Sequence, residues 1–200
     1  MSIIQSNFNS ITEKYAKTSS WAVWNNTNLS DVSFIEANKD ILNSRLVGIG
    51  LNISGELSYN WQNFHGGKHD RKLAYALNES HFKGAYLTDL FKNINQKDSK
   101  ILIDNIGANL SIINKHIDTF CEEMMDIGVN DKTIFLIFGV EKSYLGQIIS
   151  NLIKSKFQNN QFVYHYHYSY YKLTDKDWVE GLWKKIGISN NFEEIRNKYQ

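Results

Sequence analysis

Polar side chains follow three short apolar stretches that lie far apart in the sequence. Asn52 comes soon after the run 46–49, Asp89 ends a second stretch, and His167 lies near the end of a third. In an open parallel sheet the carboxyl ends of the strands share one edge, where ligands bind. We therefore expect these three side chains to converge. An Asn or a carboxylate that holds a water, together with a histidine that stabilises developing charge, is suited to hydrolysis.

Aromatic residues follow Asn52 within the loop 51–68. Tyr59, Trp61 and Phe64 can form the wall of a pocket for a flat ligand. The pair Gly66-Gly67 would let the loop fold tightly over that ligand, because glycine adopts backbone conformations closed to other residues. The sequence thus predicts a slot of the size of a nucleobase beside the polar side chains.

Strand-like and helix-like patterns alternate along the chain, which favours an α/β fold with a mainly parallel sheet. Strands are expected at 45–50, 84–89, 133–139 and 161–169. Helices are expected at 30–42, 69–80, 98–127, 141–155, 176–186 and 191–198. Residues 1–29 show little periodicity and are interpreted as a segment that covers the core. We therefore predict one domain over 1–200, a three-layer α/β/α sandwich with a short four-stranded sheet.

Composition excludes several classes of protein. The 200 residues carry a net charge of +1, so no global field attracts nucleic acid, and any such contact needs a local basic face. With Cys121 as the one cysteine, a disulfide framework or a cluster held by several thiolates is excluded. No basic-then-apolar leader is recognisable at the start, and no apolar run approaches a membrane span. We expect a cytoplasmic protein that does not contact membranes.

Two other motifs are incomplete. Gly48-Ile-Gly50 suggests a dinucleotide-binding turn, but the position of the third glycine is Ile53. No Gly-Lys-Ser/Thr follows, so a phosphate-binding Walker loop is excluded. Alternation along a last strand would place His165 and His167 on one face, yet a third metal ligand is not evident, and we predict no metal.

Four short segments, taken in order, resemble the uracil-DNA glycosylase superfamily over about residues 45–172. Gly50-Leu51-Asn52-Ile53-Ser54 occupies the place of the family's Gly-x-Asp/Asn/Glu-Pro-Tyr/Gly motif. Thr88-Asp89-Leu90-Phe91-Lys92 is similar to Thr-Asn-x-x-Lys, Ile137-Phe138-Gly139 to a strand ending in Leu-Gly, and His167-Tyr168-Ser169 to His-Pro-Ser. Both motif prolines are missing, and so are the cysteines of the iron–sulfur branch, so no cofactor is implied.

The resemblance implies a monofunctional DNA glycosylase that hydrolyses the N-glycosidic bond of a flipped base. Asn52 would orient the attacking water and His167 would stabilise the departing base. The implied base-binding residues are Gly50, Leu51, Asp89 and the stacking ring Phe64, with Trp61 as the second candidate ring. The implied contacts to the nucleic-acid backbone are Ser54, Ser169 and Lys172. The implied partner is DNA or another ligand that contains a nucleobase.

Asp89 is the most consequential departure from the family pattern, which has Asn at this place. An ionised carboxylate only accepts hydrogen bonds, so it suits a guanine-like edge with adjacent donors better than uracil. Two alternatives therefore remain open. The chain is either a nucleobase-binding domain that lacks this catalysis or catalyses another reaction, or an interaction protein that uses the aromatic region around Trp21 and Trp24.

Overall fold

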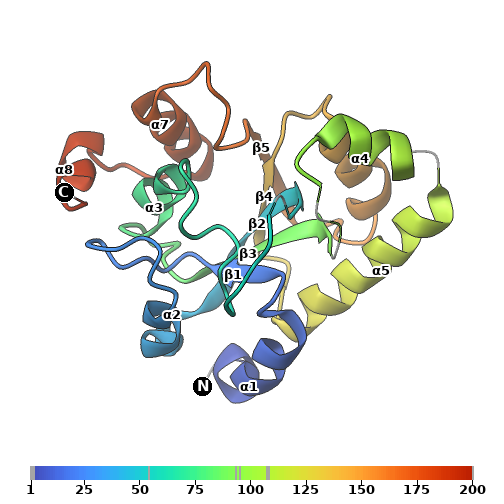
Figure 1. Ribbon diagram of the computed structural model, residues 1–200, viewed down its shortest axis with the longest axis horizontal. Helices are drawn as coiled ribbons and strands as arrows, with labels where there is room; N and C mark the ends of the chain where they lie inside the picture. The colour runs from blue at the N-terminus through green and yellow to red at the C-terminus, as the bar shows by residue number, and fades with distance from the viewer. Residues whose placement is uncertain (1–2, 54, 93, 95, 107–108, 200) are drawn as a thin grey trace.

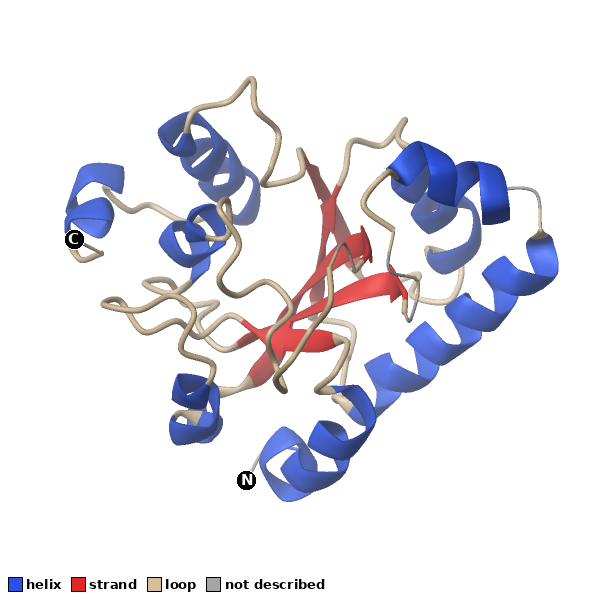
Figure 2. Ribbon diagram, viewed as in Figure 1, coloured by secondary structure: helices blue, strands red, loops and turns tan. Residues whose placement is uncertain are grey.

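A five-stranded mixed sheet forms the centre of the computed structural model, which describes residues 3–53, 55–92, 94, 96–106 and 109–199 (Figures 1 and 2). The strands lie in the order β1-β3-β2-β4-β5. Their bounds are β1 Ser19–Trp21, β2 Asn43–Asn52, β3 Ala85–Phe91, β4 Ile134–Phe138 and β5 Gln161–His165. β1 pairs with β3 in the antiparallel sense and the other pairs are parallel. The α/β prediction is confirmed, with one strand more than the four predicted.

The central strands β2, β3 and β4 are buried on both faces over most of their length, which explains their nearly continuous apolar runs. All seven residues of β3 are buried. In the register of the sheet, Gly50 of β2 lies opposite Asp89 of β3, and Ile49 lies opposite Ile137 of β4. The carboxyl ends of β2, β3 and β4 therefore share one edge, as the parallel arrangement requires.

One face of the sheet packs against helices from the N-terminal and central parts of the chain. These are α1 (Ile3–Tyr15), α4 (Ser99–Ile106), α5 (Leu110–Asp126), α6 (Tyr144–Ile148) and the π-helical turn η2 (Ile149–Ile153). Ile113, Ile117, Phe120 and Met124 of α5 recur every three or four residues, and all four are buried. The side chain of Asn109 caps α5 by accepting from the backbone N–H of Ile112.

The opposite face of the sheet is covered by three other helices. α3 (Arg71–Leu77), α7 (Asp175–Ile186) and α8 (Phe192–Asn197) gather on this side (Figure 1). Trp178 and Leu182 of α7 pack there with Leu46, Leu87 and Leu136 of the sheet. Helices thus cover both faces, and two apolar clusters form the core.

The N-terminal part of the chain is more regular than its sequence indicates. Residues 1–29, expected only as a covering segment, contain α1 and β1. The expected helix 30–42 is instead α2 (Ser33–Ala37) followed by the short 3₁₀ turn η1 (Lys39–Ile41). At the other end, β5 stops at His165, so His167 and Ser169 lie in the following loop. The expected strand 161–169 is therefore too long by four residues at its end.

Within the described part of the chain, none of the helices is long and apolar enough to cross a membrane.

Candidate functional site

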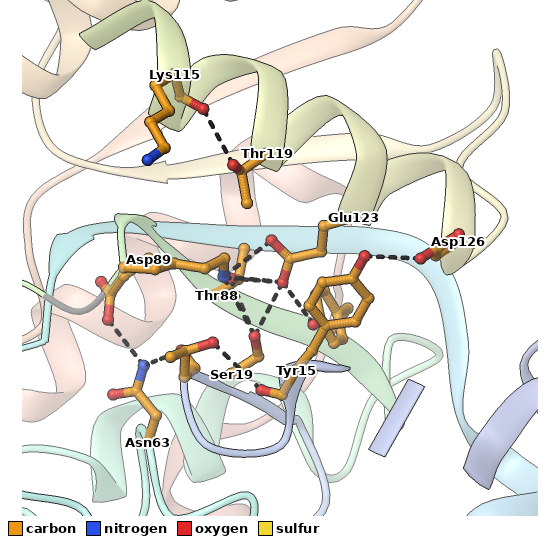
Figure 3. A network of polar contacts seen from close by, with 12 residues as sticks. Tyr15, Ser19, Asn63, Thr88, Asp89, Lys115, Thr119, Glu123 and Asp126 are labelled. Carbon is orange, nitrogen blue, oxygen red and sulfur yellow. Dashed lines mark hydrogen bonds and ion pairs between the residues drawn. The ribbon is translucent and has the colours of Figure 1, made fainter. Parts of the chain in front are cut away.

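Asp89 is a buried carboxyl group on the face of the sheet that packs against α3 and α7. Its side chain is 4% exposed, and Oδ2 accepts a hydrogen bond of 2.8 Å from Asn63 Nδ2. The same amide nitrogen donates to the backbone oxygen of Thr18 at 3.0 Å. Figure 3 shows Asp89 directed toward Asn63. Asn63, in the loop after β2, thereby fixes the orientation of the carboxyl group.

Gly50 faces this carboxyl group across the β2–β3 pair. A Cβ atom at Gly50 would collide with Asp89 Oδ1 and would lie 3.6 Å from the ring of Phe64. Glycine is needed here because the carboxyl group approaches the β2 backbone so closely. The structure thus brings together Gly50, Phe64 and Asp89, three of the residues expected to bind a base.

Three aromatic rings pack beside Asp89. The centroid of Phe64 lies 6.1 Å from those of Phe138 and Tyr168, and the last two rings are 5.5 Å apart. Phe64 has a positive φ of 65°, a conformation that costs energy in a residue with a Cβ. Tyr168 stands where the resembled family has proline, so a flat ligand on that side of Phe64 must share the space with its ring.

The protonation of Asp89 is set mainly by its burial. Burial raises the pKa of the Asp89 carboxyl to about 6, although the hydrogen bond from Asn63 and the charge of Lys92 act in the opposite direction. Burial also holds the pKa of Tyr168 well above its ordinary value, helped by the nearby carboxylates of Asp70 and Asp89. The Tyr168 hydroxyl therefore stays protonated near neutral pH.

His167 belongs to the same end of the sheet. Its ring lies 4.2 Å from Tyr168 and 6.5 Å from Phe138, measured between centroids. Nδ1 accepts the backbone N–H of Ser169 at 3.2 Å and lies 2.7 Å from Ser169 Oγ. An acceptor Nδ1 assigns the proton of the neutral ring to Nε2. Burial lowers the pKa of His167 to about 4, so at neutral pH the ring is an uncharged donor.

Asn52 ends β2 and holds the chain that follows β3. Its Nδ2 donates to the backbone oxygens of Ile53, Ile94 and Gln96 at 2.9, 3.1 and 2.8 Å. None of the hydrogen bonds found within the described part of the chain uses Asn52 Oδ1. Any contact between Asn52 and a water molecule would therefore be made by this oxygen, as an acceptor.

Trp61 and Leu51 are not part of this cluster. Trp61 is 1% exposed and packs against Trp21 and Phe8 in the core on the α1 side. Leu51 also packs against that core. Successive residues of a strand point to opposite faces, which explains why Leu51 points away while Gly50 faces Asp89.

The residues expected to contact a nucleic-acid backbone lie at the surface where the structure describes them. Ser169 and Lys172 are exposed in the loop between β5 and α7, and Lys172 Nζ lies 5.9 Å from the ring centroid of Tyr171. Ser54 lies outside the described residues.

Among the described residues, neither a metal cluster nor the cavity of about 360 Å³ belongs to this site. Among the residues described, no group of three or more His, Cys, Asp and Glu side chains could hold a metal ion. The cavity lies at the opposite end of the strands, lined among others by Asn43, Arg45 and Lys132. It does not touch the polar side chains at the carboxyl ends.

Comparison of the chain with protein-family models, curated proteins and solved structures finds no match. The resemblance to the uracil-DNA glycosylase superfamily therefore rests on the four motifs alone. Asn63, Asp70 and Tyr168 were not expected at the site. Tyr168 could have been noticed, because it replaces a motif proline, whereas Asn63 and Asp70 belong to no recognisable pattern.

Proposed function

We propose that this protein binds a nucleobase at the carboxyl edge of its sheet and hydrolyses the N-glycosidic bond of that base. The observation that carries the proposal is the Asp89 carboxyl group, which is buried yet held through only one oxygen. Its Oδ1 takes part in none of the hydrogen bonds found among the described residues. An acceptor with unused capacity on a buried residue, next to the Phe64 ring, matches the hydrogen-bonding edge and the face of a base.

Each polar group then has a definite task. Asp89 accepts from the ring N–H and the amino group of a guanine-like edge. Asn52 Oδ1 accepts a hydrogen bond from a water molecule that attacks the sugar C1′. A bond forms between C1′ and the water oxygen, and the C1′–N bond breaks with its electrons moving to the base. His167 Nε2–H donates to the base as negative charge builds there, and the water's proton is lost to solvent or to the base.

The test uses oligonucleotides that each carry one modified base, followed by alkali to cleave abasic sites. We expect strand breaks with the wild-type protein on a base with adjacent donors, and a rate reduced about 100-fold in His167→Gln. His81→Gln is the matched control, because His81 is exposed beside Phe82, far from Asp89 in the fold. Equal rates in the two variants would contradict the assigned role of His167.

A second candidate function is base binding without hydrolysis. The observation that favours it is Asn52, whose amide nitrogen is occupied by three backbone oxygens. Binding of guanosine without strand breaks on any oligonucleotide would select this function. Absence of binding to every base and nucleoside tried, measured by calorimetry, would reject both.

A further inference from the structure

The two oxygens of Asp89 have different surroundings, and this difference fixes where a proton would reside. Oδ2 accepts from Asn63 Nδ2 at 2.8 Å, which stabilises a lone pair on that oxygen. Oδ1 points at the Gly50 backbone beside the Phe64 ring. A proton on the neutral acid therefore favours Oδ1, the oxygen left free for a ligand.

We propose that Asp89 selects between two kinds of base edge through its protonation state. As a carboxylate it binds an edge with two adjacent donors, such as the ring N–H and amino group of guanine. As the neutral acid, Oδ1–H donates to a carbonyl while Oδ2 accepts from a ring N–H, and this pattern fits uracil. The inference rests on the proposed base-binding function and names the ligand class at each protonation state.

Two charged groups and one hydroxyl act on Asp89 from the neighbouring elements. Lys92 follows the last residue of β3. Its Nζ lies 2.9 Å from both carboxyl oxygens of Glu123 on α5, so the opposite charges of this ion pair largely cancel at Asp89. Tyr168, in the loop after β5, keeps its proton because burial holds its pKa well above the ordinary value.

Two further titratable groups, the ring of His167 and the carboxyl group of Asp70, lie near Tyr168. His167 has a pKa lowered by burial to about 4 and stays neutral through the relevant range. Asp70, before α3, also has a pKa raised by burial, while the backbone N–H of Gly67 stabilises its carboxylate at 2.7 Å. Burial raises the pKa of Asp89 itself to about 6, which places its change of state between mildly acidic and neutral conditions. Asp70 is therefore the group that an experiment must separate from Asp89.

Calorimetric titration with guanosine and with uridine, at about pH 5 and about pH 7.5, tests the inference. The wild-type ratio of guanosine to uridine affinity is expected to fall by up to about 300-fold on acidification, because the ratio of carboxylate to neutral acid falls tenfold for each unit of pH. Asp89→Asn, which permanently offers a donor and an acceptor, is expected to favour uridine equally at both pH values. Asp70→Asn is expected to keep the wild-type pH dependence.

The outcomes separate this inference from the function on which it rests. If neither nucleoside binds at either pH, the proposed function itself fails. If both bind but the wild-type ratio is constant, or if the ratio still changes in Asp89→Asn, the selection by Asp89 is overturned. Thermal unfolding of each variant shows that it is folded under the conditions of the titration.

Discussion

Two carboxyl groups are buried on opposite sides of β3, and their surroundings differ sharply. Glu123, on α5, has an exposed fraction of 0%, and its Oε1 accepts from four donors, while among the described residues its Oε2 makes only the ion pair with Lys92 at 2.9 Å. The four donors are Ser19 at 2.9 Å, Tyr86 at 2.6 Å, Thr88 at 3.0 Å and Lys92 at 2.9 Å. Figure 3 labels Ser19 and Thr88 beside Glu123. Asp89 is the next residue after Thr88, points the other way, and receives one hydrogen bond, from Asn63, among the described residues.

This contrast separates a structural carboxylate from a candidate recognition group. Buried charges are normally paired and hydrogen-bonded, because an isolated ion loses its hydration. Glu123 meets this rule through its ion pair with Lys92 and through three hydroxyl groups on Oε1, and it ties α5 to the sheet. Among the described residues Asp89 has one hydrogen bond and no ion pair, and its Oδ1 is the acceptor that a ligand can use.

The largest effect is expected from Lys92→Met. Removal of the ammonium group leaves Glu123 as an uncompensated buried charge, which costs about 3–5 kcal/mol of unfolding free energy. Urea unfolding at neutral pH measures it. Lys14→Met is the control, because Lys14 forms an exposed ion pair with Asp126 and its loss is expected to change stability little. Equal losses in the two variants would show that Glu123 is not held as described.

Asp89→Asn is expected to act in the opposite direction and to stabilise the protein by about 3 kcal/mol at neutral pH. The folded-state pKa of about 6 lies above that of the unfolded chain, so the folded state binds the proton more tightly. The cost of ionised Asp89 is therefore fully present above pH 6 and disappears below the unfolded pKa of about 4. Unfolding of both proteins at neutral and acidic pH measures this difference.

A half-buried carboxyl group, that of Asp31, provides the control for that experiment. The side-chain hydrogen bond from Ser33, aided by Asn25, lowers the pKa of Asp31. Asp31→Asn should therefore show the reverse trend, with wild-type stability lost relative to the variant as pH falls. A stability difference for Asp89→Asn that does not depend on pH would argue against its raised pKa.

Gly50→Ala tests how closely the Asp89 carboxyl group approaches the backbone of β2. The new Cβ atom would meet Asp89 Oδ1, and we expect a loss of about 2 kcal/mol from this crowding. The loss should shrink in an Asp89→Gly background, and a double-mutant cycle measures the coupling. Gly55→Ala is the matched control, since a Cβ atom there has no neighbour within 4 Å. Additive effects of the two substitutions would mean that the carboxyl group does not lie over Gly50.

Asn52→Ala is expected to have the smallest effect, a loss of about 1–2 kcal/mol, because its amide nitrogen serves three backbone oxygens. Chemical denaturation measures the loss, with the exposed Asn159→Ala as the reference. If stability is unchanged, the Asn52 side chain does not hold the fold together as Glu123 does. It would then resemble Asp89, a group whose hydrogen-bonding capacity the fold leaves unused.

The central strands could be predicted because their sequences are continuously apolar, and the parallel arrangement then placed Asn52 and Asp89 at one edge. α1 and β1 could not be predicted in this way. The buried residues Ile4, Ile11 and Tyr15 of α1 are diluted by polar neighbours, and β1 is only Ser-Ser-Trp. Short polar strands form because β3 offers them a partner, which is a tertiary effect.

Within the site, the positions of several side chains depend on the path of the loop after β2, which the sequence does not predict. Trp61 and Phe64 both adopt positive φ, at 63° and 65°, which no local preference of these residues indicates. This path sends Trp61 into one core, Phe64 toward Asp89, and Asn63 between them onto the carboxyl group. The role of Asn63 therefore follows from the fold and from no motif.

The most direct test of the account is a ¹³C NMR titration of the Asp89 carboxyl resonance, assigned with Asp89→Asn, with and without guanosine. We expect a midpoint near pH 6 for the free protein. We also expect a lower midpoint with guanosine, because the ligand binds the carboxylate. A midpoint of about 4, the ordinary value for aspartate, that guanosine leaves unchanged would contradict it.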